Sequence, residues 1–284
     1  SSLLVGRCFV AIRFCARSKV SSSTSASWVL GKKYCFYFLR CRRLVSDRIY
    51  KNQRQPNIDG ASQHQQHQQY NAKNILNIAL AGHGGAGKTS IIESMLYLSG
   101  ASDRLGKIAD GNTICDFDPE EVKRKASVST AVAPVEWKNK KLNFIDTPGL
   151  FDFEGGLWEG VRAADTVMIA VSGKNGVSVG TEKAVKAAES RGLSKVFFVN
   201  GLCDESARFY RVFETLKASF GPSVCPVVVP FIVDGQANCY VNLLEYKAYA
   251  YSPDGKVSEV PMPDMGDRLE GLRTAIYEAV AETS

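Results

Sequence analysis

The sequence predicts an α/β fold, a doubly wound and mostly parallel sheet with helices on both faces, followed by a small α+β subdomain. Three observations predict it. An apolar strand at 75–80 runs straight into a glycine-rich loop that opens a helix. Apolar strands and helices then alternate as far as about residue 220, which is typical of βαβ units. Beyond that point, short apolar runs separated by turn residues indicate antiparallel strands.

The glycine-rich loop fits the pattern G-x-x-x-x-G-K-[ST] of P-loop NTPases, with Gly82, Gly87, Lys88 and Thr89 at its fixed positions. This spacing lets successive backbone N–H groups wrap a phosphate, while Lys88 reaches the β- and γ-phosphate oxygens and the Thr89 hydroxyl binds Mg²⁺. The following helix adds its positive N-terminal end. The predicted nucleotide contacts in the loop are Gly82, His83, Gly84, Gly85, Ala86, Gly87, Lys88 and Thr89.

The same letters also satisfy the dinucleotide pattern G-x-G-x-x-G, and Asp103 follows at about the distance of a ribose-binding acid. That acid should end a second apolar strand, but the residues at 98–102 are Leu-Ser-Gly-Ala-Ser. A glycine turn without a ligand is disfavoured too, because Lys-Thr stands in register after an apolar strand. The phosphate loop is the better interpretation.

The other elements of the main domain follow in order. Apolar residues at helical spacing predict a helix over 91–98. A polar span at 102–130 is too long for an ordinary connection and is predicted to be a functional loop. Strands at 132–137 and 142–145 are predicted to form a hairpin. We then expect a helix at 154–164, a strand at 166–171, a helix at 181–191, a strand at 195–199 and a helix at 207–220.

The C-terminal part is predicted to be the smaller α+β subdomain. Antiparallel strands are expected at 227–233, 240–251 and 256–260, with a turn at 252–255, before a final helix with Leu269, Leu272, Ile276 and Val280 on one face. The predicted division of the chain is a basic extension at 1–72, the main domain at 73–230 and the subdomain at 231–284.

The basic charge of the chain lies in its N-terminal extension. Residues 1–72 contain twelve lysines and arginines against two aspartates, more than the whole net charge of +6. Basic residues therefore do not mark a nucleic-acid surface on the folded part, and no direct DNA binding is expected. Because no apolar period persists in it, the extension is predicted to lack a stable fold. It is either an organelle-targeting leader or a non-native flank.

Neither a membrane segment nor a disulfide framework is expected. The most apolar part of the extension, at 34–45, is interrupted by Arg40, Arg42 and Arg43 and is too short to span a bilayer. The eight cysteines form no C-x-x-C pair, which favours reduced thiols. We expect a cytoplasmic location, or a mitochondrial one if the extension is a transit peptide.

A second motif follows the hairpin. Asp146 can hold Mg²⁺, usually through water, and the backbone N–H of Gly149 can sense a γ-phosphate. Asp-Thr-Pro-Gly alone could be a plain turn, but its place one hairpin after the phosphate loop favours a nucleotide site. A hydroxyl from the long loop should complete the metal shell, and the candidates are Ser127, Ser129 and Thr130.

Together these motifs resemble the G domain of translational GTPases, most closely elongation factor G and its elongation-factor-G-like relatives. The matching stretches are 82–89, 106–113 with 116–118, 146–153 and 180–182. The resemblance runs over 74–283 and implies GTP or GDP as ligand, Mg²⁺ as metal and the ribosome as partner. It also implies that Ser127 takes the place of the switch-one threonine, which binds Mg²⁺ and the γ-phosphate. Residues from about 231 resemble the insert subdomain of elongation factor G.

Three departures from the family pattern bear on function. The family has a histidine after Asp-x-x-Gly, which helps to orient the attacking water, and Leu150 stands there in this chain. The guanine-reading Asn-Lys-x-Asp appears as Asn200-Gly201-Leu202-Cys203, with Asp204 one residue late. The resemblance also implies that the chain ends inside the insert, before the last strand and helix of the G domain.

The resemblance implies GTP hydrolysis by water, coupled to ribosome action in translation, with Lys88 and Gly149 as catalytic residues. The implied Mg²⁺ ligands are Thr89, Ser127 and Asp146. Outside the loop, the implied nucleotide contacts are Asp146, Thr147, Pro148, Gly149, Leu150, Asn200 and Cys203. Two alternatives stay open. One is a degenerate, non-catalytic nucleotide- or ribosome-binding module, and the other is a ribosomal-protection GTPase of the tetracycline-resistance type.

Overall fold

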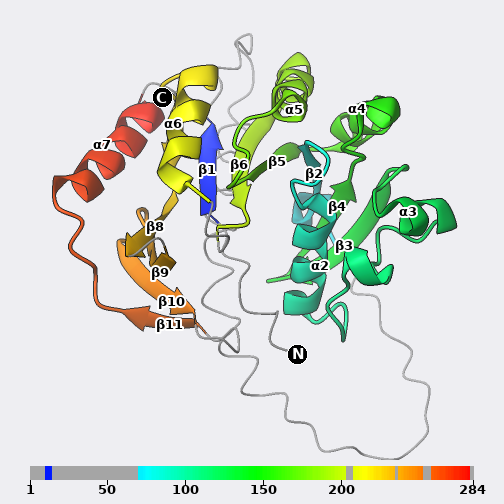
Figure 1. The fold of residues 1–284 in the computed structure, drawn as a ribbon, viewed down its shortest axis with the longest axis horizontal. Coiled ribbons are helices and arrows are strands. Elements are labelled where there is room, and N and C mark those ends of the chain that lie inside the picture. The colour runs from blue at the N-terminus through cyan, green and yellow to red at the C-terminus, as the bar shows by residue number, and fades with distance from the viewer. Residues whose placement is uncertain (1–9, 15–69, 203–206, 234–235, 252–256, 282–284) are drawn as a thin grey trace, which may run out of the picture.

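The computed structural model describes residues 10–14, 70–202, 207–233, 236–251 and 257–281, which form two sheets flanked by helices (Figure 1). The strands of the main sheet, in spatial order, are β3 (Ala131–Trp137), β4 (Lys140–Asp146), β2 (Ile75–Gly82), β5 (Thr166–Ser172), β6 (Ser194–Asn200), β1 (Val10–Phe14) and β7 (Val224–Pro226). Those of the second sheet are β11 (Val257–Val260), β10 (Lys247–Tyr251), β9 (Gln236–Asn242) and β8 (Val228–Val233).

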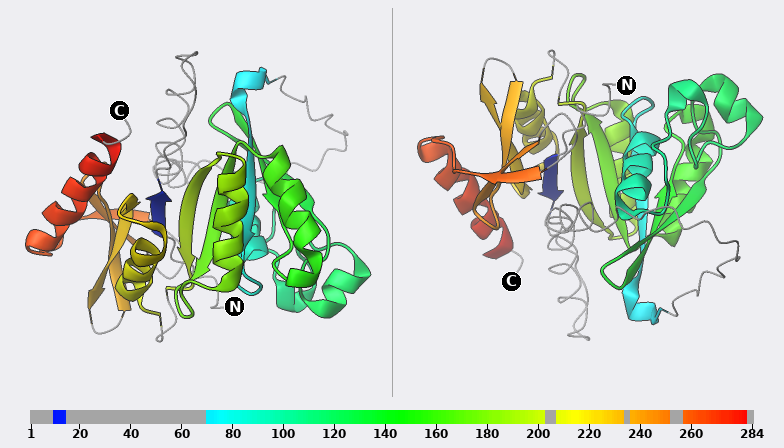
Figure 2. Two further views of the ribbon diagram at one scale, coloured as in Figure 1. Left: turned by 90° about the horizontal axis from the view of Figure 1, so that it is seen from above. Right: turned by 90° about the horizontal axis from the view of Figure 1, so that it is seen from below.

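Helices cover both faces of the main sheet (Figure 2). Helix α2 (Lys88–Ser99) packs on one face, and α4 (Glu154–Ala163) and α5 (Val179–Ser190) pack on the other. Successive side chains of β2 alternate between the two cores. Leu80 is buried with α2, whereas its neighbour Ala81 is buried with α4 and α5. The predicted doubly wound α/β fold is confirmed.

Four neighbouring strands of the main sheet, β4, β2, β5 and β6, run parallel. Their carboxyl ends therefore lie along one edge, at Asp146, Gly82, Ser172 and Asn200. In open α/β sheets this edge is where ligands bind. Strand β3 pairs antiparallel with β4 across a turn in which Lys138 and Asn139 both have positive φ, as the predicted hairpin requires.

The second sheet and the last helix, α7 (Asp267–Ala281), lie at the β7 end of the main sheet, beside α6 (Phe209–Phe220) (Figure 1). The prediction of one strand over 240–251 is wrong. Strands β9 and β10 are separate because the Asn242 side chain accepts hydrogen bonds from the N–H groups of Leu244 and Glu245 and so closes a turn.

The polar span at 102–130 is more ordered than its length suggested. It contains α3 (Pro119–Arg124), which begins with a capping box: the Asp118 side chain accepts from the backbone of the first turn, and the Glu121 side chain accepts from the N–H of Asp118. The Glu93 side chain, buried on α2, accepts hydrogen bonds from the backbone N–H groups of Gly106 and Ile114. Buried carboxylates thus fasten this segment to the domain.

The N-terminal extension departs from its prediction at one place. Strand β1 pairs antiparallel with β6 on one side and with β7 on the other, so Val10–Phe14 completes the main sheet. The prediction that the extension lacks a stable fold is therefore wrong for these residues. Its other residues up to 69, the turn at 252–255 and Cys203 with Asp204 lie outside the described residues.

Within the described residues, none of the helices combines the length and the apolar character that a membrane span needs. The cysteines at 115, 225 and 239 are buried, and none of these three forms a disulfide.

Candidate functional site

The loop after β2 takes a shape that depends on its glycines. Gly82, Gly85 and Gly87 have φ values of 137°, 77° and 88°, in the left-handed region that other residues rarely adopt. At Gly87 a β-carbon would also collide with the Asn200 side chain. The backbone N–H of Ala86 bonds to the His83 carbonyl at 3.2 Å, and α2 begins immediately afterwards. The loop is therefore a compact turn of backbone amides at a helix N-terminus, which is the arrangement that binds phosphate.

Lys88 lies at the centre of this loop. Its ammonium donates to the carbonyls of Gly82 and His83, each at 3.1 Å, and the side chain is buried. Burial lowers the pKa of Lys88, and the charges of Asp146 and Asp116 oppose that shift. A buried cation with two neutral acceptors and nearby carboxylates is placed to receive anionic oxygens.

Three hydrogen-bonding side chains meet at the mouth of the loop. The Thr89 hydroxyl donates to Asp146 Oδ2 at 2.7 Å and lies 3.3 Å from the Ser127 Oγ. Asp146 comes from the end of β4 and Ser127 from the segment after α3, 38 residues beyond Thr89 in the chain. The structure thus brings together all the residues proposed as Mg²⁺ ligands.

The donor set fits a magnesium ion. Asp146 is buried, and within the described residues its Oδ1 has no hydrogen-bond partner. Burial raises the pKa of Asp146 to about 7, although the hydrogen bond from Thr89 and the charge of Lys88 oppose the shift. A buried carboxylate oxygen without a partner is costly, and a divalent cation would satisfy it. Hydroxyl and carboxylate oxygens are the ligands that Mg²⁺ prefers.

Asp116 is a site residue to which the sequence motifs gave no role. Its Oδ1 accepts from the Ser127 hydroxyl at 2.7 Å, and its Oδ2 lies 3.4 Å from the Thr113 hydroxyl. Burial raises its pKa, while these two hydrogen bonds lower it. Asp116 lies two residues before the capping box that begins α3. That position is the sequence signal that could have indicated its role, because the capping box fixes the helix beside the loop.

The other two hydroxyl candidates are held differently. The Thr130 hydroxyl donates to the Gly156 carbonyl at 3.1 Å and to Glu159 at 3.3 Å, so it ties the loop to α4. Ser129 is anchored through its main chain, because its backbone N–H bonds to Glu121 at 3.0 Å. Among the three candidates, Ser127 is the one whose hydroxyl lies beside Thr89.

The segment Asp146-Thr147-Pro148-Gly149 is held tightly against the loop. The Thr147 hydroxyl donates to the Leu80 carbonyl at 2.6 Å, and Pro148 lies beside Gly156 at the start of α4. At Gly149 a β-carbon would meet Lys88 Nζ and lie 2.8 Å from the backbone N of Gly84. The glycine thus lets the two backbones approach where a γ-phosphate would bind.

Leu150 follows on the same side of the site. A β-carbon built on Gly84 would stand 3.2 Å from Leu150 Cδ2, so the leucine side chain lies over the loop. It remains 39% exposed. The neighbouring Phe151 packs on the loop as well, with its ring centroid 5.7 Å from that of His83. Hydrocarbon therefore covers the position at which the family pattern has a hydrogen-bonding imidazole.

Asn200 connects the base-reading strand to the loop. Its Nδ2 donates to the Ala86 carbonyl at 3.1 Å, and its Oδ1 accepts from the Gly201 N–H at 2.9 Å. Gly201 has a φ of 77° and is exposed. The asparagine thus supports the loop, whereas Cys203, the other predicted base contact, lies outside the described residues.

Comparisons with known proteins agree with this geometry. The model of the family described as elongation factor Tu GTP binding domain matches residues 73–278. An elongation factor G-like protein of Thermotoga maritima is 36% identical over 72% of this chain and 29% of its own length. Elongation factor G 1 of Bdellovibrio bacteriovorus is 31% identical over 72% of this chain and 30% of its own length. The chain thus spans about three tenths of these relatives.

A solved structure is similar to this chain in fold and in sequence. A crystal structure of a Thermus thermophilus protein superimposes with a TM-score of 0.68 at 32% identity, over 74% of this chain and 32% of that one. The matched family binds guanine nucleotide. In this structure the loop contacts the acid at the end of β4 and the asparagine at the end of β6. The chain belongs to the translational GTPases, as a GTP-binding G domain of the elongation-factor-G-like type.

Proposed function

We propose that this domain binds GTP with Mg²⁺ and hydrolyses the γ-phosphate with water, coupled to the ribosome during translation. The names of its relatives, elongation factor G-like protein and elongation factor G 1, support a role in translation. The observation that carries the proposal is the meeting of Thr89, Ser127 and Asp146 at the mouth of the phosphate loop, with one Asp146 oxygen unpaired among the described residues.

The residues of the site have separate roles in the proposed phosphoryl transfer. Lys88, buried between two carbonyls, neutralises charge that develops on the β- and γ-phosphate oxygens. The N–H of Gly149, which lies against the loop, orients the γ-phosphate. Thr89, Ser127 and Asp146 would hold the metal, directly or through water. A bound Mg²⁺ ion would neutralise negative charge on the phosphates.

A second candidate is a nucleotide-binding module that does not hydrolyse GTP, and Leu150 favours it. The leucine lies over Gly84 and has no group that could donate to or accept from a water molecule. In this version the loop binds nucleotide, and any action on the ribosome depends on binding alone. Hydrolysis measured with and without ribosomes separates the two candidates.

Substitution of Lys88 tests the binding part of the proposal. Titration of the full chain with a fluorescent GTP analogue should show binding that needs Mg²⁺ and is lost in Lys88→Ala. The matched control is Lys217→Ala, which removes an exposed lysine on α6. Unchanged binding in Lys88→Ala would contradict the proposed site.

A further inference from the structure

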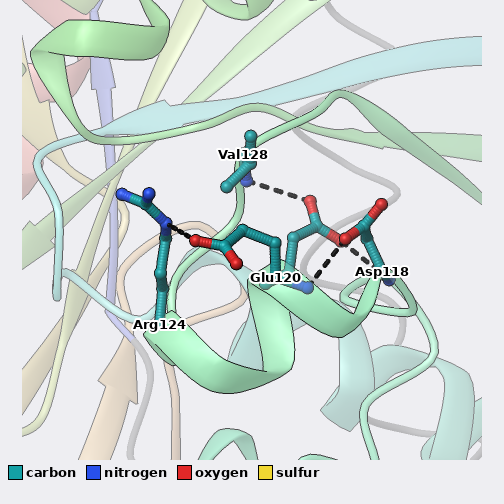
Figure 3. A network of polar contacts seen from close by, with 5 residues as sticks. Asp118, Glu120, Arg124 and Val128 are labelled. Atoms are coloured by element: carbon teal, nitrogen blue, oxygen red, sulfur yellow. Dashed lines mark hydrogen bonds and ion pairs between the residues drawn. The ribbon is translucent and has the colours of Figure 1, made fainter.

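The carboxylate of Glu121 holds the segment that carries Ser127. One oxygen, Oε1, accepts from the N–H of Val128 at 2.9 Å and from that of Ser129 at 3.0 Å. The other, Oε2, accepts from the N–H of Asp118 at 3.3 Å. Figure 3 shows the bonds that reach Val128 and Asp118. Glu121 is buried, with an exposed fraction of 2%, so these contacts are shielded from water.

The backbone carbonyl of Glu121 holds the other side of the same segment. It accepts from the N–H of Lys125, which ends α3 in a left-handed conformation with φ of 55°, and from the N–H of Ala126 at 3.2 Å. The chain therefore bonds to Glu121 on both sides of Ser127. All of these bonds are made within the chain.

These bonds exceed what the helix cap needs. A capping box requires one bond from the N3 side chain back to the N-cap N–H, here the bond to Asp118. The bonds from Val128 and Ser129 belong to the residues directly after Ser127. Fixing that backbone fixes the Ser127 hydroxyl, which reaches Asp116 at 2.7 Å and lies 3.3 Å from Thr89.

The neighbouring Glu120 provides a contrast on the same helix turn. Its carboxylate pairs with Arg124 one turn further on (Figure 3), and both side chains are about half exposed. An exposed pair of this kind contributes little to stability. The buried glutamate thus bonds to the Ser127 segment while the exposed one pairs with an arginine of its own helix, which gives a matched comparison.

We infer that Glu121 is the positioning residue for Ser127: its hydrogen bonds fix the backbone directly after Ser127, so that the Ser127 hydroxyl stands beside Thr89. This inference rests on the proposed Mg²⁺–GTP function. A carboxylate can accept all three N–H groups. Glu121→Gln keeps the size of the side chain but replaces one oxygen with an NH₂ group. That NH₂ group is a donor and cannot accept a hydrogen bond from a backbone N–H group. Residues that orient metal ligands in this way typically contribute about 10- to 100-fold to metal affinity.

Two measurements on the full chain test the inference. In the nucleotide-free protein, amide hydrogen exchange over residues 126–130 should be faster in Glu121→Gln than in wild type, and unchanged in Glu120→Gln. In a titration with a fluorescent GTP analogue, the Mg²⁺ concentration for half-maximal binding should rise about 10- to 100-fold in Glu121→Gln only. If Glu121→Gln does not fold, Glu121→Asp, which keeps the charge but withdraws the carboxylate by one methylene, takes its place.

The outcomes separate this inference from the proposed function. Wild-type protein that binds no nucleotide in a Mg²⁺-dependent way would overturn the proposed function, and the exchange measurement would still decide whether Glu121 orders the segment. Mg²⁺-dependent binding with the same Mg²⁺ requirement in Glu121→Gln and wild type would overturn the positioning role alone. Unchanged exchange over 126–130 would do the same.

Discussion

The Leu150 side chain lies over Gly84, with its Cδ2 3.2 Å from where a β-carbon on the glycine would stand. The two residues are complementary, because the loop residue without a side chain leaves the room that the leucine occupies. This contact lies beside the place where Gly149 approaches Lys88. It therefore places an apolar surface at the end of the site where we propose that the γ-phosphate binds.

The first prediction concerns hydrolysis. Because Leu150 offers no hydrogen bond to water, turnover stimulated by ribosomes should be weak, and Leu150→His should raise it. Leu150→Ala is the matched control, since it removes the same hydrocarbon without adding an imidazole. Phosphate release at saturating GTP measures the effect. Equal rates in the histidine and alanine variants would mean that another residue positions the water.

The second prediction concerns pH. The pKa of Asp146 is about 7 in the folded protein against an ordinary value of 3.8. Between these pH values the folded state holds a proton that the unfolded state has lost, so this carboxyl makes stability fall as pH rises from about 4 to about 7. Asp146→Asn should remove this pH-dependent change in the free energy of unfolding, which is on the order of 2–4 kcal/mol.

Denaturant unfolding without Mg²⁺ or nucleotide, at pH 5 and pH 8, gives the comparison. The stability of Asp146→Asn relative to wild type should be higher at pH 8 than at pH 5. A constant difference between the two proteins would show that Asp146 does not carry the buried proton.

A third prediction follows from β1. Its residues pair with both β6 and β7, so removal of residues 1–14 takes away two strand pairings. Backbone hydrogen bonds contribute about 0.5–1.5 kcal/mol each, and 1 kcal/mol shifts the melting temperature of a domain of this size by about 2–4 °C. The truncated chain should melt roughly 10 °C lower. A decrease of only about 2–3 °C relative to the full chain, the effect of roughly one such hydrogen bond, would contradict the pairing.

The fourth prediction concerns the base. Asn200 supports the loop, but Gly201 and Cys203 cannot make the contacts of the lysine and aspartate in the family pattern. An unpaired polar edge costs about 1–3 kcal/mol, or roughly tenfold in affinity. GTP should therefore be preferred over ATP only weakly, and the double change Gly201→Lys with Cys203→Asp should increase the preference about tenfold.

Competition of GTP and ATP against one fluorescent nucleotide measures this preference. The single change Gly201→Lys serves as the control, because it adds charge without the carboxylate that reads guanine. Strong GTP preference in the wild-type chain would show that Asp204 or another group already reads the base.

Local patterns predicted most of the main domain. The alternation of strands and helices, the phosphate loop and the hairpin depend on residues close together in the chain, and the structure has them. The break between β9 and β10 escaped prediction because an Asn242 side chain makes the turn without glycine or proline. The position of β1 depends on pairing with β6, far away in the sequence, which periodicity cannot indicate.

For the site, the fixed motif positions were predictable and their supports were not. Lys88, Thr89 and Asp146 follow from spacing alone. Asp116 and Glu121 act through contacts with Ser127 and the backbone after it, which exist only once α3 has folded against the loop. The sequence signal of that helix is its capping box. That box lies in a span that we predicted as a loop because of the length and polarity of the span.

The most direct test of the metal site is a crystal structure of the full chain with a non-hydrolysable GTP analogue and Mn²⁺ in place of Mg²⁺. Anomalous scattering locates the metal independently of the refined coordinates. The proposed site predicts one anomalous peak between the phosphates and the hydroxyls of Thr89 and Ser127, at roughly 2.0–2.2 Å from each, with Asp146 beside it. Nucleotide in the loop with no metal peak next to Thr89, or with the metal held by other residues, would contradict the account.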